Sequence, residues 1–312
     1  MKVSILTEGG KAIGFGHITR CISLSQAFEE KGIVSEIIVE ADEGILDLLK
    51  GKNYRIFNWL REKNKLIEIV GNADIVIIDS YLLEKSLYRR VCEIERGRIV
   101  IIDDYNRLEY ANGFVVNPSI YGDTVNYSQK DSIIYLLGKD YILLREEFWD
   151  IPEKKINKKI KKALITFGGM NHCDFIHKII DYLKERFDLN FFTVDSRKNR
   201  LNAKEMLSLM LEVDVCISAG GQTINELARV GVPTIGICFA PNQSLNLNNW
   251  ARKGFLEFAG WYNYKDLFKK IKKLLISLRY EKRIKMSKIG RRFVDGQGAR
   301  RVVKEILTYE KN

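Results

Sequence analysis

The chain has 312 residues, of which 46% are hydrophobic, and its 51 Lys and Arg against 40 Asp and Glu give a formal net charge of +11. This length and hydrophobic fraction are typical of a globular protein with two domains of roughly 150 residues each. No apolar run reaches the ~20 residues that a helix needs to cross a bilayer, and we therefore expect no stable membrane insertion.

The cysteines and the N-terminus favour a cytoplasmic protein. The five cysteines are scattered and form no CxxC pair, which is typical of free thiols in a reducing compartment. The N-terminus is strand-like almost from its first residue. It lacks the basic region, apolar segment and cleavage site of a secretion signal.

Much of the positive charge lies in residues 154–162 and 269–301. Such runs usually form solvated linkers and helix faces, although a basic surface also attracts anionic substrates or nucleic acid. No zinc-finger pattern or RNA-binding aromatic motif accompanies them, and we expect no nucleic-acid partner. Contact of basic amphipathic helices with a membrane surface stays open.

Short β-branched runs alternate with helical patterns throughout the chain. In the first half, strands are predicted over 3–7, 35–39, 75–79, 99–103 and 114–117, and the first helix over 18–31. In the second half, strands are predicted over 163–167, 189–194, 214–218 and 234–237, and helices over 223–230, 244–253 and much of 267–310. This alternation predicts an α/β protein with two Rossmann-like, doubly wound domains.

The domain boundary is predicted within 151–162, which contains Pro152 and a lysine-rich stretch and precedes a new strand. We expect an N-terminal domain over 1–152, a C-terminal domain over 162–290, and a terminal helix over 291–312 that packs back toward the first domain. Two such domains leave a crevice at the carboxyl ends of their strands, where sheets of this type bind ligands.

A glycine-rich turn containing Gly14, Gly16 and His17 follows the first strand and opens the first helix. Glycines let the backbone approach a ligand, and a helix N-terminus attracts an anion. His17 has the side chain best suited to proton transfer near neutral pH. The alternative is a plain tight turn. Arg20, one helical turn further on, either contacts a phosphate or carboxylate or is exposed.

The second half repeats this pattern with Gly220, Gly221, Gln222, Thr223 and Glu226. The glycines and Thr223 suit a diphosphate at a helix N-terminus. Glu226 lies in the first turn of the following helix, where its carboxylate can accept hydrogen bonds from ribose hydroxyls. The alternative is that Glu226 only complements the helix dipole.

Further polar residues follow predicted strands, and each has a structural alternative. Asp79 with Tyr81, and Asp103 with Asp104, are catalytic or cap the following turn. Gly168-Gly169 forms a loop at the crevice or a plain turn, and Asn242-Gln243 contacts substrate or caps a helix. The spacing of His172, Cys173 and His177 lacks a fourth ligand, and we expect no metal site.

Several of these segments together resemble a known family. The chain resembles the UDP-2,4-diacetamido-2,4,6-trideoxy-β-L-altropyranose hydrolases of pseudaminic acid biosynthesis. More broadly, it resembles the two-domain GT-B glycosyltransferases, such as the N-acetylglucosaminyltransferase of peptidoglycan synthesis. The resemblance runs nearly end to end and is carried by residues 14–21, 78–81, 102–104, 137–148, 167–169, 218–227 and 294–299.

The resemblance implies that water attacks the anomeric carbon of a UDP-sugar and UDP leaves, with no cofactor or metal. It makes His17 the general base and gives the sugar to the first domain and UDP to the second. It implies substrate contacts by Gly14, Gly16, Arg20, Asp79, Tyr81, Asn242 and Gln243, and UDP contacts by Gly168, Gly169, Ser218, Gly220, Gly221, Gln222, Thr223 and Glu226. A glycosyltransferase and a sugar-nucleotide-binding protein without catalysis are the alternatives.

Overall fold

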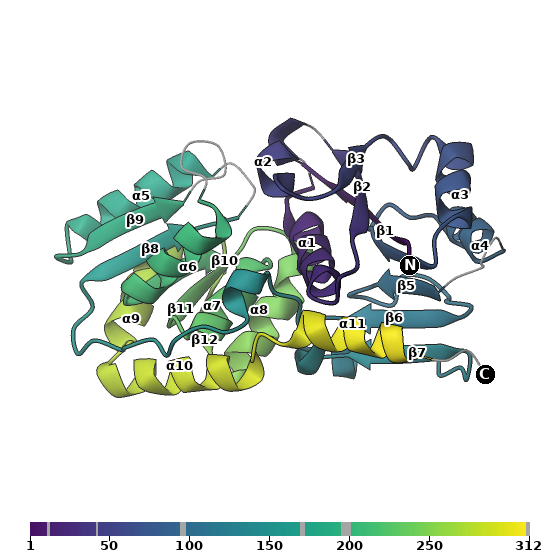
Figure 1. The fold of residues 1–312 in the computed structure, drawn as a ribbon. Helices are drawn as coiled ribbons and strands as arrows, with labels where there is room; N and C mark the ends of the chain where they lie inside the picture. The colour runs from purple at the N-terminus through teal and green to yellow at the C-terminus, as the bar shows by residue number, and fades with distance from the viewer. Residues whose placement is uncertain (11–12, 42, 94–97, 169–171, 195–200, 310–312) are drawn as a thin grey trace. The chain divides into compact units, whose positions relative to one another are not determined.

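The computed structural model describes residues 1–10, 13–41, 43–93, 98–168, 172–194 and 201–309 (Figure 1). The chain divides into two compact units. Unit 1 comprises Met1–Glu146 and Gly296–Asn312, and unit 2 comprises Glu147–Asp295. These bounds differ from the boundaries at 152, 162 and 290 that the sequence predicts.

Within its described residues, unit 1 contains a seven-stranded sheet in the order β3-β2-β1-β4-β5-β6-β7, with every neighbouring pair parallel. The strands are β1 Val3–Gly9, β2 Ser35–Ala41, β3 Tyr54–Ile56, β4 Ile75–Asp79, β5 Arg98–Ile102, β6 Gly113–Asn117 and β7 Ile133–Leu137. The helices are α1 Gly16–Glu29, α2 Leu46–Leu49, α3 Lys63–Gly71, α4 Lys85–Glu93 and α11 Gly298–Thr308, with 3₁₀ turns at Glu43–Ile45, Gly122–Thr124, Lys139–Tyr141 and Glu146–Phe148 (the last straddling the boundary).

The described part of unit 2 contains a five-stranded parallel sheet in the order β12-β11-β10-β8-β9. Its strands are β8 Lys162–Thr166, β9 Asn190–Val194, β10 Val215–Ala219, β11 Thr234–Cys238 and β12 Leu256–Trp261. Its helices are α5 Cys173–Lys184, α6 Ala203–Glu212, α7 Thr223–Val230, α8 Pro241–Lys253, α9 Leu267–Ser277 and α10 Tyr280–Phe293.

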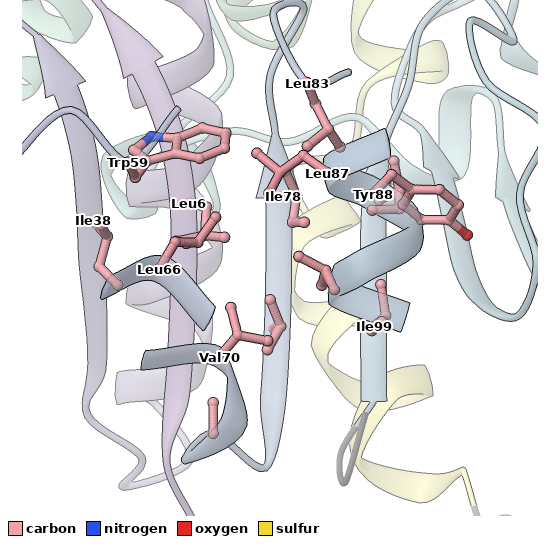
Figure 2. Packing of buried hydrophobic residues seen from close by; sticks show 14 of the residues in the cluster. Leu6, Ile38, Trp59, Leu66, Val70, Ile78, Leu83, Leu87, Tyr88 and Ile99 are labelled. Atoms are coloured by element: carbon pink, nitrogen blue, oxygen red, sulfur yellow. The ribbon is translucent and has the colours of Figure 1, made fainter. Parts of the chain in front are cut away.

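The sheet of unit 1 is buried on both faces, which explains its nearly continuous apolar strands. Leu6, Ile38 and Ile78 face helices α3 and α4, as Figure 2 shows. The alternate strand positions point to the opposite face and are also buried, among them Ile5 and Ile77. Apolar burial on both faces stabilises the sheet and fixes the carboxyl ends of β1, β4 and β5 as neighbours.

The structure confirms the predicted fold class of two Rossmann-like, doubly wound sheets. The nine predicted strands are present, and their ends match the prediction or differ from it by one or two residues. The sequence does not predict β3, β7 and β12. The first helix spans Gly16–Glu29 rather than 18–31, and Gly32 with φ +73° ends the turn that follows it. Helix α8 begins at Pro241 rather than 244, because proline is tolerated in a first helical turn.

Candidate active site

The histidine of the first glycine-rich turn is held at the start of α1. Strand β1 ends at Gly9, and the turn after it is closed by two backbone hydrogen bonds between Gly10 and Gly14, of 3.1 and 2.7 Å. Gly14 has φ +89°, a conformation that favours glycine. His17 is the second residue of α1 and is only 5% exposed. The turn therefore fixes His17 in a nearly dry environment.

His17 is paired with the last residue of β4. The Nδ1 atom of His17 lies 2.6 Å from Oδ1 of Asp79, whose side chain is fully buried. The Nδ1 atom also lies 3.0 Å from Nη2 of Arg20, which can only donate. We assign the ring proton to Nδ1, because the contact with the Asp79 carboxylate, which only accepts, is the shorter one. Among the residues that the structure describes, no protein group is recorded within hydrogen-bonding distance of Nε2. That nitrogen is therefore the one able to accept a proton from a ligand.

Arg20 binds two carboxylates at once. Its Nε and Nη2 atoms donate to Asp79 at 2.9 and 2.7 Å, and its Nη1 atom donates to both oxygens of Asp104 at 2.9 and 2.8 Å. Burial by itself lowers the pKa of Arg20, but Asp104 and Asp79 outweigh burial and raise that pKa above its ordinary value. The guanidinium thus faces protein carboxylates, and its contact with substrate stays a prediction.

Tyr81 and Asp104 complete this cluster. The Tyr81 hydroxyl donates to Asp104 Oδ2 at 2.5 Å, and the Tyr81 ring lies edge-to-face on His17 with ring centres 4.3 Å apart. Burial and then Asp104 raise the pKa of Tyr81 well above its ordinary value, and it remains a donor. Burial raises the pKa of Asp104, but Arg20 and Tyr81 outweigh burial and hold it below its ordinary value.

Asp103 has a different role from its neighbour Asp104. Its carboxylate accepts the backbone N–H groups of Tyr105 and Arg107 at 3.1 and 3.0 Å. Asp103 therefore caps the turn after β5, which is the structural alternative that the sequence left open. The sequence indicates Asp104 only as a strand-end residue. It offers no motif for Glu8, the penultimate residue of β1, although a lone acid near the end of a buried apolar strand is a signal in itself.

In unit 2, the second glycine-rich turn joins β10 to α7. A Cβ atom on Gly220 would lie 2.7 Å from Leu247 Cγ, so α8 packs closely onto this turn. Gly221 has open space around the same position, which leaves its backbone accessible. Gln222 precedes α7, Thr223 begins it, and Glu226 lies in its first turn.

The burial of the remaining predicted UDP-contact residues is uneven. Glu226 and Ser218 are buried, at 3% and 1% exposed. The Ser218 hydroxyl donates to the Ala219 carbonyl at 3.1 Å. Gly168 follows β8 with φ +72° and open space around its Cβ position. Gly169 lies outside the described residues.

Gln243 ties two loops of unit 2 together. Its Oε1 atom accepts the N–H groups of Phe239 at 3.0 Å and Gly220 at 3.4 Å. Asn242 is exposed and is the second residue of α8, whose N-cap is Ala240. The interpretation of Asn242 as a helix cap is therefore wrong, because Pro241 already occupies the first helical position.

Within the described ranges, no three His, Cys, Asp or Glu side chains are grouped as a metal ion requires. No described helix combines the length and apolar character needed to cross a membrane.

Two units of this kind, each with a parallel sheet and intervening helices, define a protein of the GT-B fold. The structure is similar to that of Acinetobacter baumannii MurG, with a TM-score of 0.68, 14% identity, and coverage of 99% of this chain and 100% of that one. It is also similar to a UDP-N-acetylglucosamine 2-epimerase, with a TM-score of 0.59, 14% identity, and coverage of 98% and 96%. At these identities the likeness concerns the fold alone.

The relatives found by sequence similarity define a narrower group of proteins than the fold does. A Helicobacter pylori pseudaminic acid cytidylyltransferase and UDP-2,4-diacetamido-2,4,6-trideoxy-β-L-altropyranose hydrolase is 27% identical over 82% of this chain and 48% of its own length. The Campylobacter jejuni UDP-2,4-diacetamido-2,4,6-trideoxy-β-L-altropyranose hydrolase is 21% identical over 82% and 98%. The Bacillus subtilis spore coat polysaccharide biosynthesis protein SpsG is 24% identical over 97% and 96%.

The similarity that the motifs indicate is thus confirmed: the chain resembles UDP-2,4-diacetamido-2,4,6-trideoxy-β-L-altropyranose hydrolases and a spore coat polysaccharide biosynthesis protein. No protein-family model matches the chain. The chain spans about half the length of some relatives. It covers 48% of the Helicobacter pylori protein, and 55% of an uncharacterized Methanocaldococcus jannaschii protein that is 26% identical over 75% of this chain.

Proposed function

We propose that this chain hydrolyses a UDP-linked diacetamido-trideoxy sugar to the free sugar and UDP, in the biosynthesis of a pseudaminic-type nonulosonic acid. The observation that carries the proposal is the buried His17–Asp79 pair, with Nε2 of His17 left to accept a proton. The named activities of the Helicobacter and Campylobacter relatives support the choice of substrate.

In the proposed reaction, His17 acts as general base. Its Nε2 atom takes a proton from water while the water oxygen forms a bond to the anomeric carbon. The bond from that carbon to the diphosphate oxygen breaks, and UDP leaves with the electron pair. Direct displacement inverts the anomeric carbon. The proton on His17 then passes to solvent, which restores the base.

Asp79 and Arg20 prepare His17 for this step. Asp79 accepts a hydrogen bond from Nδ1–H, which holds the imidazole in the productive tautomer, and its charge stabilises the imidazolium that forms. Arg20 fixes Asp79 through two hydrogen bonds and is itself fixed by Asp104. We propose that the backbone of Gly14 and Gly16, together with Tyr81, contacts the sugar.

We propose that unit 2 binds UDP. The accessible backbone at Gly221 and the N-terminus of α7 suit the diphosphate, whose growing charge they stabilise as it leaves. Glu226 accepts hydrogen bonds from the ribose. The other proposed contacts of UDP are Gly168, Gly169, Ser218, Gly220, Gln222 and Thr223, and those of the sugar are Asn242 and Gln243. We propose that no metal or cofactor takes part. The five cysteines form no disulfide, which suits a reducing compartment, and we propose that the reaction takes place in the cytoplasm.

The GT-B fold favours a second candidate, a glycosyltransferase in which an acceptor alcohol replaces water. A release assay separates these candidates. UDP-2,4-diacetamido-2,4,6-trideoxy-β-L-altropyranose is incubated with the protein in buffer alone, and UDP and free sugar are quantified. Equal amounts of both are expected. UDP release only with an added acceptor points to transfer, and tight binding without release under either condition points to a protein that binds without catalysis.

A further inference from the structure

Glu8 connects the strand that precedes the His17 turn to the residue that packs on His17. It is the penultimate residue of β1 and is fully buried. Its Oε1 atom accepts the backbone N–H of Tyr81 at 2.6 Å. Because β1 and β4 are parallel neighbours with Thr7 opposite Asp79, Glu8 lies where β4 ends and Tyr81 follows. Glu8 therefore fixes the backbone that carries the Tyr81 ring against His17.

The carboxyl of Glu8 also interacts electrostatically with His17. Burial, with a smaller contribution from Asp79, raises the pKa of Glu8 above its ordinary value, although a positive charge on His17, the Ser80 hydroxyl and the Tyr81 N–H act in the opposite direction. A proton on His17 therefore favours the ionised form of Glu8, and the carboxylate and the imidazolium then stabilise each other. Asp79 contacts Nδ1 of His17 directly, but its charge is shared with Arg20.

The titratable groups that face His17 come from four parts of unit 1. They are Glu8 on β1, Arg20 on α1, Asp79 at the end of β4 with Tyr81 just after it, and Asp104 after β5. Tyr81 is neutral, and the other four can carry charge. These groups include three carboxyl groups but one guanidinium, which contacts Asp79 and Asp104, so negative charge is in excess when all three carboxyl groups are ionised. Of the three, Glu8 alone has no recorded hydrogen bond to Arg20 among the described residues. The Glu8 carboxyl is therefore not paired with the guanidinium, and a proton arriving on His17 favours its ionised form.

We propose that Glu8 is a positioning residue for His17, which holds the Tyr81 backbone in place and stabilises the imidazolium that forms when His17 accepts a proton. The predicted effect on turnover rests on the proposed function. The predicted effect on protonation of His17 does not, because it can be measured without substrate.

The test compares Glu8→Gln with a matched control, Glu40→Gln. Glutamine at position 8 keeps an oxygen that accepts the Tyr81 N–H but removes the charge. Glu40 lies opposite Glu8 in the β1–β2 register, and its carboxyl accepts a hydrogen bond from Asn58 at 2.7 Å. The chain has three histidines, so imidazole NMR signals can be followed against pH and the His17 signal assigned with His17→Asn.

In folded Glu8→Gln, the titration midpoint of the His17 signal should fall by about one pH unit, since loss of one nearby charge commonly has an effect of this size. In Glu40→Gln it should stay unchanged. The acidic limb of the kcat profile should move with it, and kcat near pH 7 should fall by less than about tenfold, because a base weakened by one pKa unit loses at most that factor under Brønsted behaviour. Thermal melting confirms that each variant is folded.

An unchanged His17 midpoint in folded Glu8→Gln overturns the inference, even if the wild type releases UDP. A lowered midpoint in a protein that releases no UDP supports the inference and contradicts the proposed function. An equal fall of the His17 midpoint in Glu8→Gln and Glu40→Gln also overturns the inference, because any carboxylate near the carboxyl ends of these strands would then have the same effect.

Discussion

Replacing Asp79 by Asn tests the pairing that prepares His17. The substitution keeps the size of the side chain but removes the charge that accepts three hydrogen bonds, at 2.6 Å from His17 and at 2.9 and 2.7 Å from Arg20. Arg20 keeps its two bonds to Asp104. Loss of one partner of a buried ion pair costs about 3 kcal/mol of the free energy of unfolding or somewhat more. A protein stable by about 5–15 kcal/mol still folds after this loss.

The cost to catalysis should be larger than this loss of stability suggests. The asparagine oxygen can still accept from Nδ1, but its NH2 group replaces an acceptor of Arg20 by a donor, and the imidazolium loses its direct counter-charge. We expect kcat to fall about 10²–10⁴-fold, the range usual for groups that set up proton transfer, which corresponds to about 3–5 kcal/mol of activation free energy. The assay is UDP release from the saturating UDP-sugar at a temperature well below the melting midpoint of the variant.

Asp103→Asn is the matched control, because the adjacent Asp103 caps a turn and does not contact His17. It should lose about 1 kcal/mol of stability and keep its kcat. If folded Asp79→Asn turns over as fast as Asp103→Asn, Asp79 does not prepare His17 and this reasoning is refuted.

Three other outcomes are expected. Glu226→Ala should weaken UDP binding about 10–100-fold in calorimetry with little loss of kcat, because the hydrogen bonds of its carboxylate to the ribose are present in ground and transition states alike. An unchanged affinity for UDP would show that Glu226 only complements the dipole of α7. Lys154, whose Nζ donates to the Leu211 carbonyl at 2.7 Å, has its pKa lowered by burial from 10.5 to about 8. Between about pH 8 and pH 10.5, Lys154 is protonated more often in the unfolded chain than in the folded protein. The free energy of unfolding should therefore rise with pH across this window, by up to about 3 kcal/mol. Urea denaturation of Lys154→Met should lack that rise, and parallel curves for both proteins would contradict it. EDTA should leave UDP release unchanged, and loss of activity restored by a divalent cation would contradict a metal-free reaction.

The sequence predicted both sheets because their central strands are continuous apolar runs, such as Ile75 to Ile78, that only a doubly covered parallel sheet buries. The strands it missed lie at sheet edges. Strand β3 is exposed along its length, which removes the burial pattern, and β12 contains Gly260 with φ +111° beside an irregular register. Edge strands carry weaker patterns because one side of the ladder and part of the surface face solvent.

The site was predicted in part for a similar reason. The glycines before His17 and Glu226 mark turns between a strand and a helix, and a turn can be recognised from neighbouring residues alone. His17 and Glu226 both lie in the first turn of the helix that follows, as the sequence predicts. The pairings of Arg20 with Asp79 and Asp104 join residues 59 and 84 positions apart, and they depend on the adjacency of β1, β4 and β5. Glu8 has no spacing motif at all, because its partner Tyr81 contributes only a backbone N–H.

The most direct test of the account is the release of UDP by the wild type and by His17→Asn from UDP-2,4-diacetamido-2,4,6-trideoxy-β-L-altropyranose in the absence of an acceptor. The wild type should yield UDP and free sugar in equal amounts. The variant should lose about 10²–10⁴-fold in kcat while UDP affinity in calorimetry is retained. Near-normal kcat in the variant would contradict the account, because water would then be activated without His17.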